Sequence, residues 1–84
     1  MKNKILIELI VPEIEETYNL YIPVNKRIGN VIILMTKAIF DISSGTYSIN
    51  GNSSLYNRET GQKYSVNDLI RETDIRNGTS LILM

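Results

Sequence analysis

The sequence contains no cysteine, no histidine and no tryptophan among its 84 residues. Without cysteine there are no disulfides, thiol catalysis or thiolate metal sites. Without histidine the commonest general base and the commonest metal ligand are missing. Nine basic residues balance nine acidic ones, whereas nucleic-acid-binding domains usually carry a basic excess. We therefore expect that the protein is not an enzyme, has no cofactor or metal site and does not bind nucleic acid.

Long hydrophobic runs are also missing. No stretch approaches the roughly 20 apolar residues that span a bilayer, so we expect no direct membrane insertion. The first eleven residues mimic a short signal peptide, but Glu8 interrupts the apolar run, Pro12 ends it, and no small-residue cleavage site follows. The expected location is therefore the cytoplasm. The length suits a single domain, residues 1–84, with one thin core.

Two alternating apolar runs, residues 4–11 and 17–24, predict a β-hairpin joined by a short polar link. Pro23 has no amide donor for a β-ladder, so the second strand is expected at a sheet edge. In the first run, one face of the strand carries the side chains expected to be buried: Ile5, Ile7, Leu9 and Val11.

One long helix is predicted over residues 26–40, with Asn25 as its N-cap. Ile33 and Phe40 are seven residues apart and lie away from the main apolar stripe, so the helix is more apolar than one buried face requires. The stripe itself consists of apolar residues at helical spacing: Ile28, Val31, Ile32, Met35, Ile39 and Ile42.

The second half of the chain contains shorter elements. Residues 41–54 are predicted to be mainly loop, with a short strand at 46–49. Residues 55–58 and 62–64 predict two short strands, with Gly61 supplying a positive φ at the turn.

A short helical turn is expected to follow these strands. It is predicted to begin at Ser65, with Asp68 in the capping-box position. The last strand is predicted over residues 79–84.

This order of elements has few packing solutions, because the helix stripe needs a sheet to cover it. A central last strand, parallel to the first, lets one helix cross a mixed sheet. The predicted fold class is therefore α+β, a β-grasp with a first hairpin, one main helix, two further strands, a short helix and a central fifth strand.

Over nearly its full length the sequence resembles the ubiquitin superfamily. Residues 55–64 (LYNRETGQKY) resemble the third and fourth strands of ubiquitin-like proteins, and residues 65–68 (SVND) resemble the turn that follows them. Residues 75–83 (IRNGTSLIL) resemble the ending of the domain, and Ile22-Pro23-Val24 resembles the approach to the main helix.

Among bacterial proteins, the sequence most resembles the small YukD/EsaB group associated with type VII (WXG100/ESX) secretion. This resemblance implies a non-conjugated ubiquitin-like protein-binding module that is a cytosolic accessory or regulatory component of such a system. The long loop after the helix, and about one extra helical turn at residues 69–74, depart from the pattern.

The end of the sequence bears on conjugation. Ubiquitin and the sulfur carriers need a flexible terminal Gly-Gly, whereas this sequence ends Leu81-Ile82-Leu83-Met84 inside a predicted strand. For a complete sequence we expect neither conjugation nor sulfur transfer. Two alternatives stay open: a truncated Gly-Gly-tailed modifier or sulfur carrier, and a ubiquitin-like domain excised from a larger membrane protein.

The expected protein-binding site is the outer face of the sheet, the usual docking surface that the ubiquitin-like resemblance implies. Burial of Leu81 and Leu83 against the helix would leave the intervening residues pointing outward. A covering loop, or a register shift of one residue, would remove this surface. The residues predicted to form it are Leu6, Ile10, Tyr21, Tyr56, Ile82 and Met84.

Weaker candidates lie elsewhere. Ile33 and Phe40 would form a secondary helix patch, although the interpretation that we favour is that the loop over residues 41–54 covers them. We interpret Glu13, Glu15 and Glu16 as a solvated turn.

Partner expectations follow from these sites. The expected partner is a protein, such as a secretion-machinery component. Lys26, Arg27 and Lys37 could contact an anionic surface, a minor alternative at zero net charge. A homodimer through an exposed edge strand is a further expectation.

Overall fold

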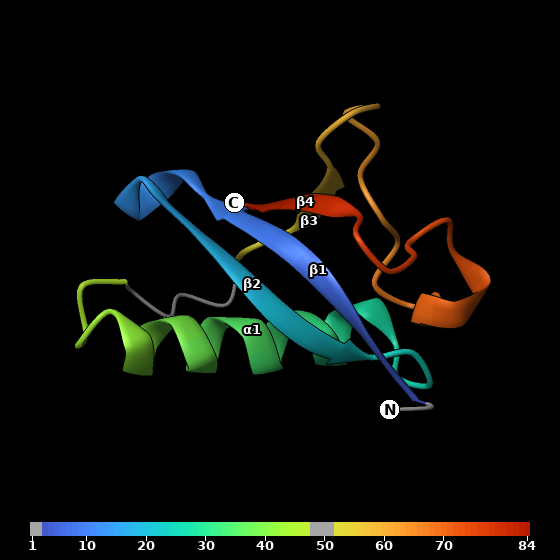
Figure 1. Ribbon diagram of the computed structural model, residues 1–84, viewed down its shortest axis with the longest axis horizontal. Helices are drawn as coiled ribbons and strands as arrows, with labels where there is room; N and C mark the ends of the chain where they lie inside the picture. Colours follow the sequence, from blue (N-terminus) through green and yellow to red (C-terminus); the bar gives the residue numbers. More distant parts are fainter. Residues whose placement is uncertain (1–2, 48–51) are drawn as a thin grey trace.

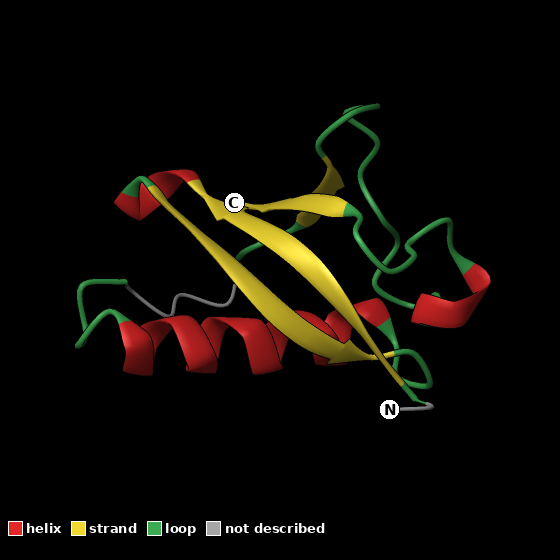
Figure 2. Cartoon of the chain, viewed as in Figure 1, coloured by secondary structure: helices red, strands yellow, loops and turns green. Residues whose placement is uncertain are grey.

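The computed structural model describes residues 3–47 and 52–84. One helix crosses one face of a four-stranded mixed sheet, and two short 3-10 helices lie in the connections (Figures 1 and 2). The elements are β1 (Lys4–Val11), η1 (Pro12–Ile14), β2 (Glu16–Pro23), α1 (Ile28–Ile42), β3 (Leu55–Asn57), η2 (Ile70–Glu72) and β4 (Ser80–Leu83).

The last strand lies in the middle of the sheet, in the order β2-β1-β4-β3. β4 runs parallel to β1, with Leu81 opposite Leu9, and antiparallel to β3. β1 and β2 form the expected antiparallel hairpin. The α+β class and the mixed sheet with a central last strand are therefore as expected.

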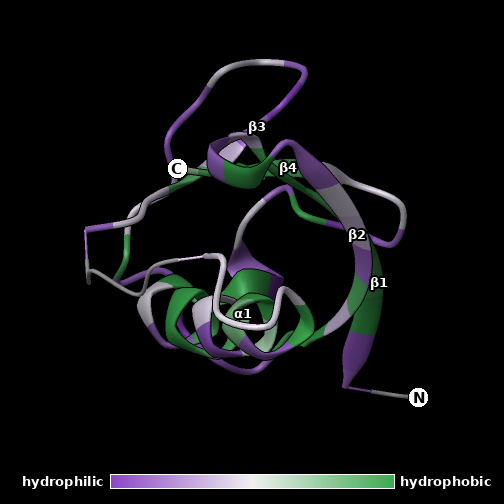
Figure 3. Cartoon of the chain, turned by 90° about the vertical axis from the view of Figure 1, so that its left-hand side faces the viewer, coloured by the Kyte–Doolittle hydropathy of each residue, from purple (hydrophilic) through white to green (hydrophobic). Residues whose placement is uncertain are grey.

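The core lies between α1 and the inner face of the sheet, which curves over one side of the helix (Figure 3). Leu81 and Leu83 are at most 1% exposed, so the last strand faces inward as expected. Five residues of the helix stripe are buried as well: Ile28, Val31, Ile32, Met35 and Ile39.

Ile42 departs from the expected stripe, because its side chain is 55% exposed. It is the last residue of α1 and lines an open groove together with Ile14 and Tyr18. The sheet therefore does not cover this end of the helix.

The predicted start of the helix was wrong. α1 begins at Ile28, and neither Asn25 nor the N-cap residue Arg27 caps it with a side chain. Instead, the backbone amides of Ile28 and Gly29 donate to the carbonyls of Asp68 (2.8 Å) and Val66 (3.0 Å). A loop distant in sequence thus satisfies amides that every helix start leaves open.

The same contacts explain why the helical turn expected from Ser65 does not form. The carbonyls of Val66 and Asp68 are engaged with α1, and the amide of Ile70 donates to the Lys26 carbonyl (3.0 Å). Residues 65–68 therefore form a turn, Leu69 forms an isolated bridge with Arg27, and the only helical segment described in this region is η2.

The prediction of a five-stranded sheet was also wrong, because residues 62–64 do not form a strand. They fold back along β3 after a turn in which Gly61 has the expected positive φ of 75°. Only one bridge forms, between Lys63 and Tyr56. The chain then leaves the sheet as the side chain of Tyr64 enters the core, where it is 5% exposed.

Several other boundaries differ from those expected. β2 begins and ends one residue earlier than predicted, α1 ends at Ile42 instead of residue 40, and β4 covers residues 80–83 instead of 79–84. Of the strand expected at residues 46–49, residues 46 and 47 are not in a strand, and residues 48 and 49 lie outside the described residues. β3 ends at Asn57 rather than at Arg58. The Asn57 side-chain oxygen accepts the amides of Glu59 (2.8 Å) and Thr60 (3.1 Å), which turns the chain away from the strand.

Two neighbours in β4 test this arrangement. We expect Leu81→Ala to lower the free energy of unfolding by about 2–5 kcal/mol, because it opens a cavity at a fully buried position. Ile82→Ala, on the opposite face of the same strand, should cost only about 1 kcal/mol, because Ile82 is half-exposed. Urea denaturation of both variants measures the difference, and equal losses would contradict the assigned faces.

Candidate functional site

The outer sheet face is the side of the sheet opposite α1. In β1 and β4, residues of the core alternate with half-buried residues that point the other way. Tyr21 and Met84 are the most exposed members, at 57% and 59%. All six predicted binding residues lie on this face or at its end: Leu6, Ile10, Tyr21, Tyr56, Ile82 and Met84.

Three of these residues form a continuous apolar row across the sheet. Ile82 lies in β4, directly opposite Ile10 of β1 on one side and Tyr56 of β3 on the other. Side chains directly opposite each other on neighbouring strands are in contact distance. We call Ile10, Ile82 and Tyr56 the Ile82 row. Exposed Lys63 continues it beyond Tyr56, so the row has a basic end.

Leu6 and Tyr21 form a separate pair, directly opposite each other on β1 and β2. A polar contact divides this pair from the Ile82 row, because the Ser80 hydroxyl donates to the Glu8 carboxylate (2.8 Å). The predicted residues therefore form two apolar groups rather than one patch. Their role in binding stays a prediction.

Met84 lies at the β3 side of this face. Its backbone exchanges two hydrogen bonds with Ser54, at 2.8 and 3.1 Å, which extends the β3–β4 pairing by one residue. Its side chain is thereby held at the end of the outer sheet face, beyond Ile82.

The helix patch is not assembled as one surface. Ile33 is 52% exposed and lines a groove with Val66, itself 52% exposed. Phe40 is 40% exposed and lies near Gly45. Among the described residues, the loop after α1 does not bury either side chain.

Two exposed apolar residues were missed at the sequence level. Val66 was assigned to a short helix, and Leu34 lay outside the predicted stripe and patch. Leu34 is 51% exposed and lines a groove between α1 and β2. The spacing of Leu34 from the buried stripe was the available signal, but it does not reveal which strand lies beside it.

A polar cluster surrounds the hydroxyl of Tyr64, whose side chain is buried. The Tyr64 hydroxyl donates to the Asp74 carboxylate (2.6 Å) and accepts a hydrogen bond from the Asn57 amide (3.0 Å). Burial, together with the bond to Asp74, raises the pKa of Tyr64 to about 12. A phenol with this pKa stays protonated near neutrality, and both of its neighbours hold it in place. The cluster joins β3 to the segment before β4.

No group of acidic side chains in the described residues is arranged to hold a metal ion. Glu13, Glu15 and Glu16 do not converge on one point that could bind a cation. Within residues 3–47 and 52–84, no helix combines the length and hydrophobicity that crossing a membrane requires.

No protein-family model and no curated protein matches the chain. Solved structures do match it. The crystal structure of the ubiquitin-like domain of PLXNC1 has a TM-score of 0.76 and 12% identity, covering 96% of this chain and 97% of that chain. A ubiquitin from Caldiarchaeum subterraneum has a TM-score of 0.68 and 11% identity, with 95% and 90% coverage.

A chain of the MycP5-free ESX-5 inner membrane complex is also similar, with a TM-score of 0.72 and 10% identity. The match covers 98% of this chain but only 21% of that one. Together these likenesses show a ubiquitin-like β-grasp fold.

The Tyr64 cluster generates a prediction on alkaline stability. The pKa of Tyr64 is raised in the folded state to about 12, from an ordinary value of 10.0. The protonated Tyr64 hydroxyl therefore contributes fully to the free energy of unfolding below pH 10, and this contribution is lost as the pH rises to 12. Tyr64→Phe should cost about 1–2 kcal/mol at neutral pH and remove this part of the alkaline loss. Denaturation at several pH values measures it, with Tyr56→Phe as control. If the Tyr64→Phe variant loses as much stability between pH 10 and 12 as the unchanged chain does, the alkaline loss does not come from Tyr64.

Proposed function

We propose that the chain is a non-conjugated ubiquitin-like module that docks a partner protein on its outer sheet face and carries out no chemistry itself. The Ile82 row is the observation that carries this proposal. Three apolar side chains from three strands stand together on the face that the helix leaves uncovered. A rigid sheet holds them in place, so binding them costs little conformational ordering.

The surroundings of the row indicate the chemistry of the partner. Lys63 stands at the end of the row beyond Tyr56. Arg58 follows β3 and lies beside Ser80, because its amide donates to the Ser80 carbonyl (3.1 Å). Both side chains are exposed. Glu8, on the other side, is engaged by Ser80. The partner that fits best presents apolar side chains to the Ile82 row and a carboxylate to Lys63.

The proposed setting is the cytosolic side of a bacterial type VII secretion system, where the module acts as an accessory or regulatory component. Two observations support this setting: the overall resemblance of the sequence to the YukD/EsaB group, and the fold shared with a chain of the ESX-5 inner membrane complex. The proposed location is cytoplasmic.

One alternative has an observation in its favour. The match to the ESX-5 chain covers about a fifth of that chain, as expected if this fold is one domain of a larger membrane protein. A Gly-Gly-tailed modifier or sulfur carrier is the other alternative. The genomic sequence after codon 84 separates the three: a stop codon, a Gly-Gly tail or a continuation into hydrophobic spans.

Substitutions in the Ile82 row test the docking surface. We expect Ile82→Asp and Tyr56→Ala each to weaken binding to cytosolic parts of the secretion machinery by about tenfold or more, because each removes a central apolar contact. Lys63→Glu should weaken the same complex through charge repulsion. Isothermal titration calorimetry of purified partners measures these changes.

Ile33→Asp is the matched control, because it places the same charge at an exposed apolar residue on the helix side. The Ile33→Asp variant should bind the partner protein with the same affinity as the unchanged chain. Loss of binding with Ile33→Asp, and none with Ile82→Asp, would move the site to the helix and refute the sheet-face proposal.

A further inference from the structure

The free edge of β2 differs from the other edge of the sheet. The outer edge of β3 is already occupied, because Asn57 donates to the Gln62 carbonyl (2.8 Å) and Tyr64 donates to the Leu55 carbonyl (2.9 Å). In the part of the chain that the structure describes, only β1 pairs with β2. One side of β2 therefore stays open to another strand.

The backbone groups on this open edge can be assigned from β1. The Glu8 amide donates to the Thr79 carbonyl, and the Leu6 carbonyl accepts from the Gly78 amide. The backbone groups of Glu8 and Leu6 thus point away from β2, so those of Ile7 and Leu9 face β2. By the alternation of antiparallel pairs, the amides and carbonyls of Thr17, Asn19 and Tyr21 point away from β1.

The edge has little of the usual protection against pairing between its two ends. Natural edge strands are commonly guarded by lysine or another charge within the strand. Residues 17–23 (TYNLYIP) carry no charge. Apart from the charge of Glu16 at the first position of β2, only Pro23 at its end guards the edge, and it withholds one donor without blocking the residues before it.

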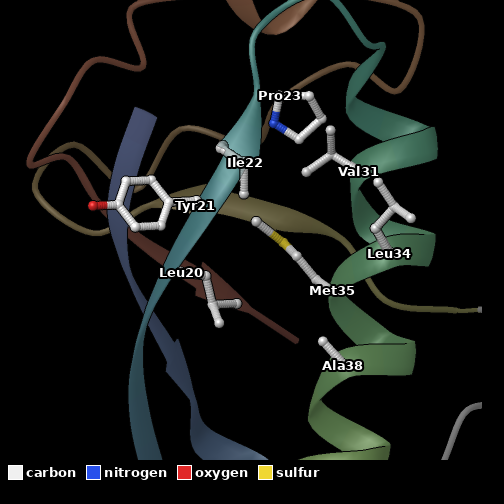
Figure 4. A pocket seen from close by; sticks show the side chains of 8 residues that line it. All are labelled: Leu20, Tyr21, Ile22, Pro23, Val31, Leu34, Met35 and Ala38. Carbon is white, nitrogen blue, oxygen red and sulfur yellow. The ribbon is translucent and has the colours of Figure 1, made fainter. Parts of the chain in front are cut away.

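An apolar groove runs beside this edge, between β2 and α1 (Figure 4). Leu34 of α1, which is 51% exposed, flanks β2 on the helix side, and Tyr21 flanks it on the outer sheet face. A strand added to β2 would cover both. The residues lining the groove are Leu20, Tyr21, Ile22, Pro23, Val31, Leu34, Met35 and Ala38.

The charges at the two ends of β2 indicate which strand fits its open edge. The start of β2 is acidic, with Glu15 and Glu16 exposed. Its end is basic, with exposed Lys4 opposite Pro23 and exposed Lys26 in the following turn. An antiparallel copy of the same strand brings the acidic end of each subunit to the basic end of the other, so the edge is complementary to itself.

We propose that a second copy of this chain pairs antiparallel with β2, forming an eight-stranded sheet across a two-fold axis. Asn19 faces its own counterpart on the axis, and Thr17 faces Tyr21 of the other copy. This register uses every outward amide of the strand and leaves Pro23 outside the ladder. The interface is separate from the Ile82 row, so it does not rest on the proposed docking function.

The absence of cysteine permits a direct test of the register. Directly opposite residues of antiparallel strands lie about 4.5–5.5 Å apart at Cα, within the span of a disulfide. Asn19→Cys should therefore form a disulfide-linked dimer under mild oxidation. Thr17→Cys and Tyr21→Cys should not link to themselves but should link when mixed. No link through Asn19→Cys, or a self-link through Tyr21→Cys, would overturn the proposal.

Charge reversal tests the self-complementarity by sedimentation velocity over a range of concentrations. The unchanged chain should dimerise. A chain with Glu15→Lys and Glu16→Lys, and a chain with Lys4→Glu and Lys26→Glu, should each stay monomeric alone and form a heterodimer when mixed. A monomeric unchanged chain at every concentration, or no heterodimer on mixing, would overturn the proposal.

Asn19 gives a second signature of the two-fold axis. Asn19→Lys and Asn19→Asp should both raise the dimer dissociation constant by about fivefold or more, because either charge faces a copy of itself. Ile82→Asp should leave dimerisation unchanged, which separates this interface from the docking face. Thermal unfolding by circular dichroism verifies that each variant is folded. Opposite effects of the two Asn19 charges would refute the two-fold arrangement.

Discussion

Burial of the apolar stripe of α1 against the central strands β1 and β4 is the interaction on which the rest of the structure depends. A chain of 84 residues has room for one such contact and little more. Parallel pairing of the first and last strands places Leu9 and Leu81 side by side beneath the helix. With that face occupied, the alternate side chains of the same strands must point outward, and the outer sheet face follows directly from the core.

Much of this arrangement could be predicted because it repeats at short sequence intervals. Alternation at residues 4–11 gave the bounds and the buried face of β1, and helical spacing from Ile28 to Ile39 identified the stripe of α1. The start of the helix could not be found in this way. Asn25 is a good capping residue by type, but the carbonyls of Val66 and Asp68 accept the first helical amides instead. No local sequence pattern predicts a partner some forty residues away.

The sequence predicted which residues lie on the outer sheet face, but it did not predict how they are arranged there. Alternation along each strand places Ile10, Ile82 and Tyr56 on the outer face, but only the register between three strands shows that they form one row. The division by Glu8 and Ser80 depends on the same register. Leu34 was missed because its significance comes from the neighbouring edge of β2, which no spacing within the helix reveals.

The capping of α1 by the loop before η2 links two parts of the chain that are far apart in sequence. The amides of Ile28 and Gly29 can exchange with solvent hydrogen only when the 66–68 segment lifts away. Detachment of that segment also uncovers Ile70, which is fully buried. The beginning of the helix and the η2 region therefore open together as one cooperative unit, and exchange at two amides reports on a loop nearly half the chain away.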